Sequence, residues 1–184
     1  MKQSHTHSLI VLTLLTGMLI SLTGCIYTPW KNTLKKDLPR LGHRNFVVVA
    51  DSAYPLQSAP GIKTIYTDAN HIKVLKHVLA EVQAAPHVNP IVYIDSELKS
   101  MQESDAPGIS AIRSQLKAAV KGADIKELPH MEIIKKLNES SRLFNVLLFK
   151  TDLTLPYTSV FMELDCGYWD ADKEAKLRKA LEKE

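Results

Sequence analysis

The sequence lacks the short motifs of the most familiar enzyme classes. Its seven glycines form no loop of the kind that cradles a phosphate and no turn of the kind that exposes a nucleophile. Its seven histidines are scattered, without the regular spacing of metal ligands. These absences argue against most familiar classes of enzyme and give no sign of a metal site.

Cysteine is also scarce, because the chain has only Cys25 and Cys166. If Cys25 carries a lipid, Cys166 has no partner for an intrachain disulfide. We interpret Cys166 as a buried small apolar residue, with an intermolecular bridge as the alternative. The formal net charge is only +3, and no cluster of Lys and Arg is long enough for a nucleic-acid surface. Nucleic acid is therefore not an expected partner.

Charged side chains are missing from residues 8–30, whose centre is the apolar run Leu9 to Ile20. With Lys2 in front of it, this run is typical of a secretory signal peptide. Polar residues interrupt the run, which is at the short end for a membrane span of about 20 apolar residues. The sequence Leu22-Thr23-Gly24-Cys25 follows and places small residues before a cysteine that can take a lipid.

These features predict a bacterial lipoprotein in which residues 1–24 are removed as a signal peptide and Cys25 is lipidated. The membrane is then a partner through that lipid, and the protein lies in the cell envelope, facing the periplasm if the cell is Gram-negative. An uncleaved membrane anchor is the alternative. The 160 residues that remain of 184 suit one domain with its own core.

We expect three parts after the signal peptide: a tether and first helix over 25–40, a folded domain over 41–168, and a charged C-terminal helix over 169–184. Strands and helices alternate through the domain, which predicts an α/β layered fold with a mostly parallel sheet flanked by helices. Strands are expected at 46–50, 62–66, 91–94, near 125, 143–149 and 158–164. Helices are expected at 30–40, 68–82, 109–120, 130–141 and 171–184.

The strand at 46–50 is apolar at every position, as expected for a strand covered on both faces. His43 lies just before this strand and Asp51 just after it. Five strand residues span about 17 Å, so the two side chains cannot meet in one subunit unless the loops fold back. Either His43 and Asp51 have different roles, or neighbouring subunits complete one site.

These elements resemble the D-ribose pyranase and L-fucose mutarotase family. Members show a Leu-Gly-His box, an apolar strand and Asp-Ala-x-x-Pro, which match Leu41-Gly42-His43, residues 46–50 and Asp51-Ser52-Ala53-Tyr54-Pro55. The resemblance continues through the helix after Asp68 and through Pro156-Tyr157-Thr158-Ser159-Val160. It covers about residues 30 to 168.

The chain also departs from the family pattern. Family members have Gly or Thr directly after the histidine and then usually Asp, whereas this chain has Arg44 and Asn45 at those two positions. Ser159 stands where members have Asn. His130 corresponds only loosely to the second histidine of pyranases, because its spacing to Tyr157 is several residues too long. Family enzymes are cytoplasmic whereas this chain carries an export signal, so its physiological role need not be theirs.

The resemblance implies the ring opening and reclosure of a monosaccharide, without a cofactor. It implies catalytic roles for His43, Asp51 and Tyr157, with a site built between subunits of a ring-shaped homo-oligomer. Substrate-binding roles are implied for the remaining candidates, which are Ser159, His130, Arg44 and Asp68. A non-catalytic lipoprotein that binds carbohydrate or assembles with envelope partners is the alternative function.

Each candidate also has a plain structural interpretation. Without a functional role, His43 would be a loop residue and Asp51 would cap the end of a strand. Tyr157 would pack in the core, and His130 would begin a helix. The other histidines of the domain, His71, His77 and His87, are expected to be solvated.

Overall fold

The computed structural model describes residues 29–182. The signal peptide expected over 1–24 and the lipid expected on Cys25 lie outside the described residues. Within 29–182, no helix is long and apolar enough to cross a membrane.

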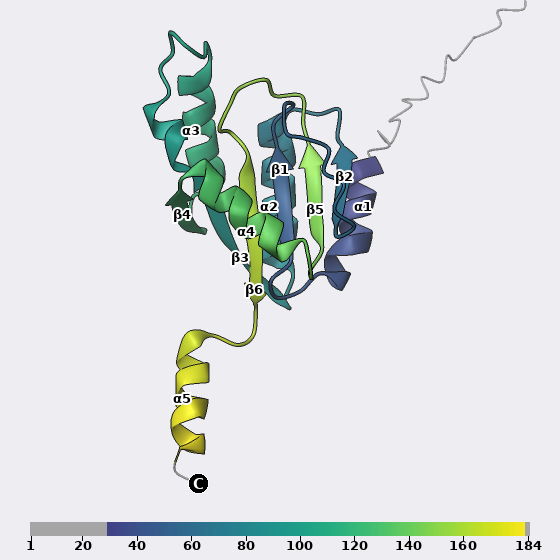
Figure 1. Ribbon diagram of the computed structural model, residues 1–184, viewed down its shortest axis with the longest axis vertical. Helices are drawn as coiled ribbons and strands as arrows, with labels where there is room; N and C mark the ends of the chain where they lie inside the picture. Colours follow the sequence, from purple (N-terminus) through teal and green to yellow (C-terminus); the bar gives the residue numbers. More distant parts are fainter. Residues whose placement is uncertain (1–28, 183–184) are drawn as a thin grey trace, which may run out of the picture.

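The described residues form a six-stranded sheet in the order β2-β5-β1-β6-β3-β4. β6 is antiparallel to its neighbours β1 and β3, and the other pairs are parallel (Figure 1). This sheet confirms the predicted α/β fold class. The strands are β1 (Phe46–Ala50), β2 (Ile62–Tyr66), β3 (Val88–Asp95), β4 (Asp124–Leu128), β5 (Val146–Lys150) and β6 (Val160–Cys166).

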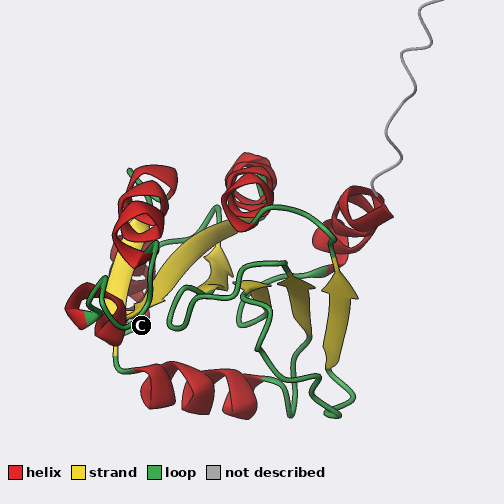
Figure 2. Ribbon diagram, turned by 90° about the horizontal axis from the view of Figure 1, so that it is seen from above, coloured by secondary structure: helices red, strands yellow, loops and turns green. Residues whose placement is uncertain are grey.

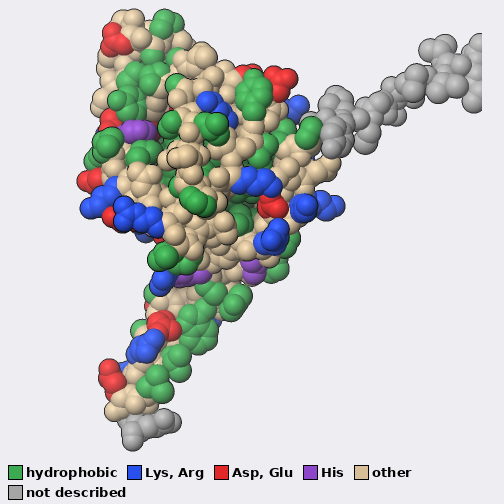
Figure 3. All heavy atoms as spheres, turned by 45° about the vertical axis from the view of Figure 1, so that its right-hand side comes forward, with side chains coloured by type: hydrophobic (Ala, Val, Ile, Leu, Met, Phe, Trp, Pro, Cys, Tyr) green, Lys and Arg blue, Asp and Glu red, His purple; other side chains and the backbone are tan. Residues whose placement is uncertain are grey.

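Helices cover both faces of the sheet (Figure 2). One face carries α1 (Pro29–Asp37), α2 (His71–Ala84) and α3 (Ile109–Ala119), and the other carries α4 (His130–Ser140). Two short 3-10 helices, η1 (Leu38–Arg40) and η2 (Ser96–Ser100), follow α1 and β3. The last helix, α5 (Ala171–Leu181), has no buried residue and projects from the domain with apolar side chains along it (Figure 3).

β1 and α2 form where their sequence patterns place them. All five residues of β1 are buried, because Val47 and Val49 pack under α1–α3 while Phe46 and Val48 pack towards α4. Fully burying each of these side chains is worth about 1.5–3 kcal/mol. α2 is capped by Asn70, whose side chain accepts a hydrogen bond from the Lys73 backbone N at 3.2 Å.

The strand directions gather several loop residues at one edge of the sheet. β1, β3, β4 and β5 are mutually parallel and end at this edge, and the antiparallel β6 begins there. Val49 and Ile94 both pair with Val160, so the residues that follow β1, end β3 and precede β6 are close neighbours. We call this edge the carboxyl edge.

Several expectations about the ends of the domain are corrected. The helix assigned to a tether is part of the core, because Trp30 and Leu34 of α1 are buried. The strand expected from Leu143 begins at Val146, because a turn after α4 has the backbone N of Leu143 donating to Ser140 O. Cys166 is half-buried rather than buried.

The strand expected at 91–94 is longer than its apolar run and extends over Val88–Asp95. Pro90 is tolerated inside it because β4 pairs with β3 only from Ile91 onward, so the missing N–H interrupts no bond on that side.

The histidines expected to be solvated are partly or fully buried. The ring of His77 packs edge-on against Trp30, with 5.3 Å between centroids, and His87 Nε2 lies 3.0 Å from Leu41 O. His71 has no exposed surface, and its Nδ1 lies 2.8 Å from Thr151 Oγ1. The sequence gives no signal that His71 is buried, because a polar residue at the start of a helix is usually exposed. Its burial results from the docking of α2 on the sheet.

The buried His71 makes the stability of the fold depend on pH. Burial lowers the pKa of His71 from 6.5 to about 4, so the unfolded chain takes up the proton first as the pH falls. The free energy of unfolding therefore decreases as the pH falls from 6.5 to about 4, by up to about 3 kcal/mol. We expect His71→Asn to lose less stability over this range than the wild type, as measured by urea unfolding at several pH values. His43→Asn, at an exposed position, is the control, and an equal loss in His71→Asn and wild type contradicts the assignment.

Candidate functional site

A hollow of about 320 Å³ opens at the carboxyl edge, and we call it the carboxyl-edge pocket. Its walls come from the loop after β1, the first turns of α4 and the turn before β6. The mainly apolar wall with a few polar groups is typical of small-ligand sites. The lining residues are Asp51, Ala53, Tyr54, Pro55, Gln57, His130, Met131, Ile134, Pro156 and Tyr157.

Asp51 is fixed by hydrogen bonds to both of its carboxylate oxygens. The Ser159 hydroxyl donates to Oδ2 at 2.8 Å, and the Ala53 backbone N donates to Oδ1 at 2.9 Å. The Asp51 backbone N in turn donates to Ser159 Oγ at 3.2 Å. The carboxylate is therefore held in one orientation before any ligand arrives.

His130 is held at the first position of α4. Its backbone N donates to the Glu97 carboxylate at 3.0 Å, which takes the place of a side-chain cap for this helix. Its Nδ1 lies 3.1 Å from Asp95 Oδ1, and its ring meets the Tyr157 ring edge-on, with 5.6 Å between centroids. Backbone and side chain are both restrained, so the imidazole faces the pocket in a defined position.

Tyr157 adopts a left-handed backbone conformation with φ of 57°. This conformation is uncommon for a bulky residue and costs about 1–3 kcal/mol. The Thr158 hydroxyl donates to Leu155 O at 2.7 Å and closes the turn that enforces it. The strained turn directs the Tyr157 ring into the pocket wall beside His130.

Tyr54 lines this pocket and Asp95 contacts His130, although the sequence analysis assigned neither residue to a site. Both are almost fully buried, and among the described residues Asp95 Oδ2 and the Tyr54 hydroxyl have no hydrogen-bond partner. Burial raises the pKa of Asp95, opposed by His130. Burial, then the charges of Asp51 and Asp95, raises the pKa of Tyr54. The available signal for Asp95 was its position directly after an apolar run, as for Asp51.

The other candidates lie away from the pocket. His43 is at the opposite end of β1, as the strand length predicts, with 55% of its side chain exposed and its Nδ1 2.9 Å from Asp165 Oδ1. Arg44 is beside it, and Asp68 is exposed between β2 and α2. Within one chain the structure brings together the candidates of the carboxyl edge, which are Asp51, His130, Tyr157 and Ser159.

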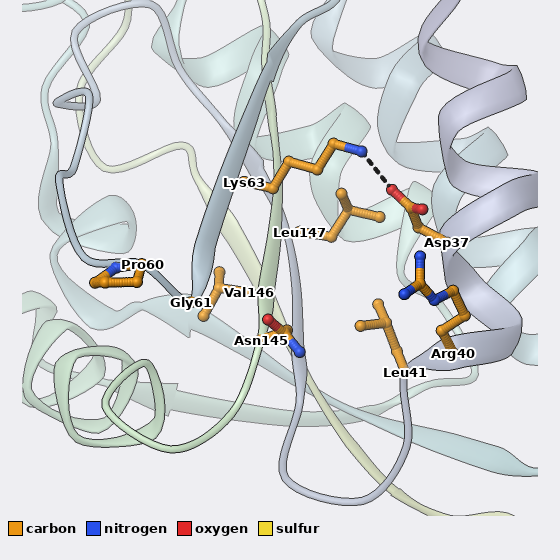
Figure 4. A pocket seen from close by; sticks show the side chains of 9 residues that line it. All are labelled: Asp37, Arg40, Leu41, Pro60, Gly61, Lys63, Asn145, Val146 and Leu147. Carbon is orange, nitrogen blue, oxygen red and sulfur yellow. Dashed lines mark hydrogen bonds and ion pairs between the residues drawn. The ribbon is translucent and has the colours of Figure 1, made fainter.

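A second hollow, of about 370 Å³, lies at the opposite edge, between η1 and the starts of β2 and β5 (Figure 4). Lys63 Nζ crosses it to Asp37 Oδ2 at 2.7 Å, so these two charges neutralise each other. Its lining contains no histidine and none of the candidate residues. This second hollow therefore has fewer groups that can exchange a proton with a ligand than the carboxyl-edge pocket.

No group of three or more His, Cys, Asp or Glu side chains within 29–182 is placed to hold a metal ion. The polar groups of the carboxyl-edge pocket are instead a hydrogen-bonded carboxylate, an imidazole and tyrosine. These groups can accept hydrogen bonds from hydroxyls and exchange protons.

Three solved structures resemble this chain in fold. RbsD from Bacillus subtilis complexed with D-ribose aligns with a TM-score of 0.52 and 18% identity, over 72% of this chain and 91% of that one. The chain shares its fold. The fucose mutarotase from Streptococcus pneumoniae in complex with L-fucose aligns with a TM-score of 0.50 and 17% identity, over 72% of this chain and 91% of that one. FucU from Bifidobacterium longum aligns with a TM-score of 0.50 and 15% identity, over 73% of this chain and 94% of that one.

No family model matches the chain, and no curated protein sequence matches it.

Replacing Ser159 by Ala tests the anchoring of Asp51. The variant leaves Asp51 Oδ2 and the Asp51 backbone N without the Ser159 hydroxyl at a nearly buried position. We expect a loss of about 1–3 kcal/mol in the free energy of unfolding, measured with urea. Thr154→Ala, at an exposed site in the same loop, is the control and changes stability by less than about 0.5 kcal/mol. Equal stabilities of the two variants would show that the bond is not formed.

Proposed function

We propose that this chain binds a monosaccharide of the ribose or fucose type in the carboxyl-edge pocket and catalyses the opening and reclosure of its ring. One observation carries the proposal. Asp51, His130 and Tyr157 converge on a cavity of about 320 Å³, in a fold shared with structures complexed with D-ribose and L-fucose.

Ring opening needs one base and one acid. The base removes the proton of the anomeric hydroxyl, the bond between the anomeric carbon and the ring oxygen breaks, and the ring oxygen receives a proton from the acid. Reclosure reverses these steps, so the reaction needs no oxidant, metal or other cofactor. Histidine suits either role near neutral pH, and each positioned group contributes about 10²–10⁴-fold to the rate.

The residues divide these tasks between them. Asp51, held by Ser159 at 2.8 Å, accepts hydrogen bonds from sugar hydroxyls. Tyr157 and Ser159 hold the anomeric end of the sugar, and His130, whose ring contacts that of Tyr157, binds it from the same side.

His43 reaches this site from a second copy of the chain. Its exposed position at the far end of β1 prevents contact with Asp51 in the same subunit and leaves it accessible to a neighbour. A homo-oligomer in which the His43–Arg44 end of one subunit faces the pocket of the next would supply the His43 imidazole to that pocket as a proton-transfer group. The mature protein is held at a membrane of the cell envelope by a lipid on Cys25.

Two observations favour a second candidate, a carbohydrate-binding lipoprotein without catalytic activity. His43 Nδ1 is engaged by Asp165, and Ser159, which is shorter than the Asn usual in the family, is engaged by Asp51. This candidate predicts sugar binding without exchange between anomers.

Anomeric exchange in D-ribose and L-fucose, measured by NMR saturation transfer, tests the proposal. We expect the soluble form from Ile26 onward to accelerate exchange above the buffer rate. Asp51→Asn and His43→Ala should each lower the acceleration at least about 10²-fold, because each removes one group of the site. Asp152→Asn, at an exposed position after β5, should keep full activity. Exchange at the buffer rate in the wild type, with sugar bound, would establish the second candidate instead.

Mixing the two inactive variants tests whether one site uses two subunits. After dissociation and reassociation of equal amounts of His43→Ala and Asp51→Asn, about one quarter of the interfaces pair an intact Asp51 with an intact His43. The mixture should then recover up to about a quarter of wild-type activity. No recovery, with mixed oligomers verified by mass spectrometry, would show that His43 does not act across subunits.

A further inference from the structure

A buried carboxylate lies directly behind His130. Asp95 ends β3, and only 1% of its side chain is exposed. Its Oδ1 lies 3.1 Å from His130 Nδ1, and its Oδ2 has no partner among the described residues. Since Nδ1 is engaged by Asp95, Nε2 is the ring nitrogen left for the carboxyl-edge pocket, which His130 lines.

Groups from several elements face His130. Asp95 of β3 and Glu97 of η2 both contact His130, one at the ring and one at the backbone N. The facing group from the turn before β6 is the uncharged Tyr157 ring. The carboxylate of Asp51 also lines the pocket.

Asp95 is poorly explained as a stabilising residue. A buried carboxylate costs free energy unless each of its oxygens is paired, and one oxygen of Asp95 is not paired within the described residues. Burial also raises its pKa, which means that the fold opposes its ionisation. A residue kept at this cost beside an imidazole in a pocket wall points to a role in proton transfer.

We propose that Asp95 is a positioning residue that holds His130 in the tautomer with hydrogen on Nδ1, so that Nε2 accepts the proton of the anomeric hydroxyl and later returns it. This inference rests on the proposed function and adds a base to it. His130 Nε2 takes the proton, the bond to the ring oxygen breaks, and the ring oxygen takes its electron pair and a proton from His43 of the neighbouring copy. Asp95 stabilises the imidazolium that forms, and reclosure reverses each transfer.

Asp95→Asn separates this role from a structural one. The amide matches the carboxylate in shape, but its NH₂ group can donate to Nδ1, which selects the opposite tautomer. In the full chain, purified in detergent, we expect ¹⁵N NMR to show neutral His130 with hydrogen on Nδ1 in the wild type and on Nε2 in the variant. We expect exchange of D-ribose to fall about 10²–10⁴-fold with a nearly unchanged KM, and the Tm to equal or exceed that of the wild type. Asp124→Asn, at an exposed position on β4, is the control and should match the wild type in all three measurements.

Three results would overturn the proposal. The first is a wild-type His130 with its hydrogen on Nε2, which needs no variant to detect. The second is an Asp95→Asn variant with the wild-type exchange rate, and the third is a variant that loses activity only in proportion to a lower Tm. Absence of exchange in the wild type would instead reject the proposed function, while the tautomer measurement would still decide whether Asp95 sets the state of His130.

Discussion

The carboxyl edge of the sheet is the constraint on which the rest of the site depends. Parallel strands end at the same edge, and here β1, β3, β4 and β5 do so while the antiparallel β6 starts there. This arrangement brings Asp51, Asp95, His130 and Ser159 together although they are far apart in the sequence. The opposite ends of the same strands place His43 out of reach, so a site that needs both histidines needs two subunits.

Several polar groups at this edge are buried without hydrogen-bond partners among the described residues, which lowers the stability of the fold. Asp95 Oδ2 and the Tyr54 hydroxyl have no partner among residues 29–182, and Tyr157 keeps a left-handed backbone conformation. Unpaired polar groups and strained residues destabilise a fold. Tyr54 and Tyr157 line the carboxyl-edge pocket, where the hydroxyl groups of a bound ligand can form hydrogen bonds with them.

The sequence predicted the elements whose pattern is local. The unbroken apolar run at β1 and the regular apolar spacing of α2 identify a buried strand and an amphipathic helix, and the alternation of elements gives the fold class. It did not predict the burial of His71 or the core position of α1, because both depend on how helices dock on a sheet whose strand order the sequence does not contain. Asp95 was missed for the same reason, since its nearness to His130 follows from the pairing of β3 with β4.

The most direct measurement of the central claim is a crystal structure of the protein grown with D-ribose or L-fucose. The account predicts one sugar per subunit in the carboxyl-edge pocket, with hydroxyls bonded to Asp51, its anomeric oxygen near His130 Nε2, and His43 of a neighbouring copy closing the site. A sugar bound in the hollow between η1 and β2, or His43 turned to solvent in every copy of the assembly, would contradict it.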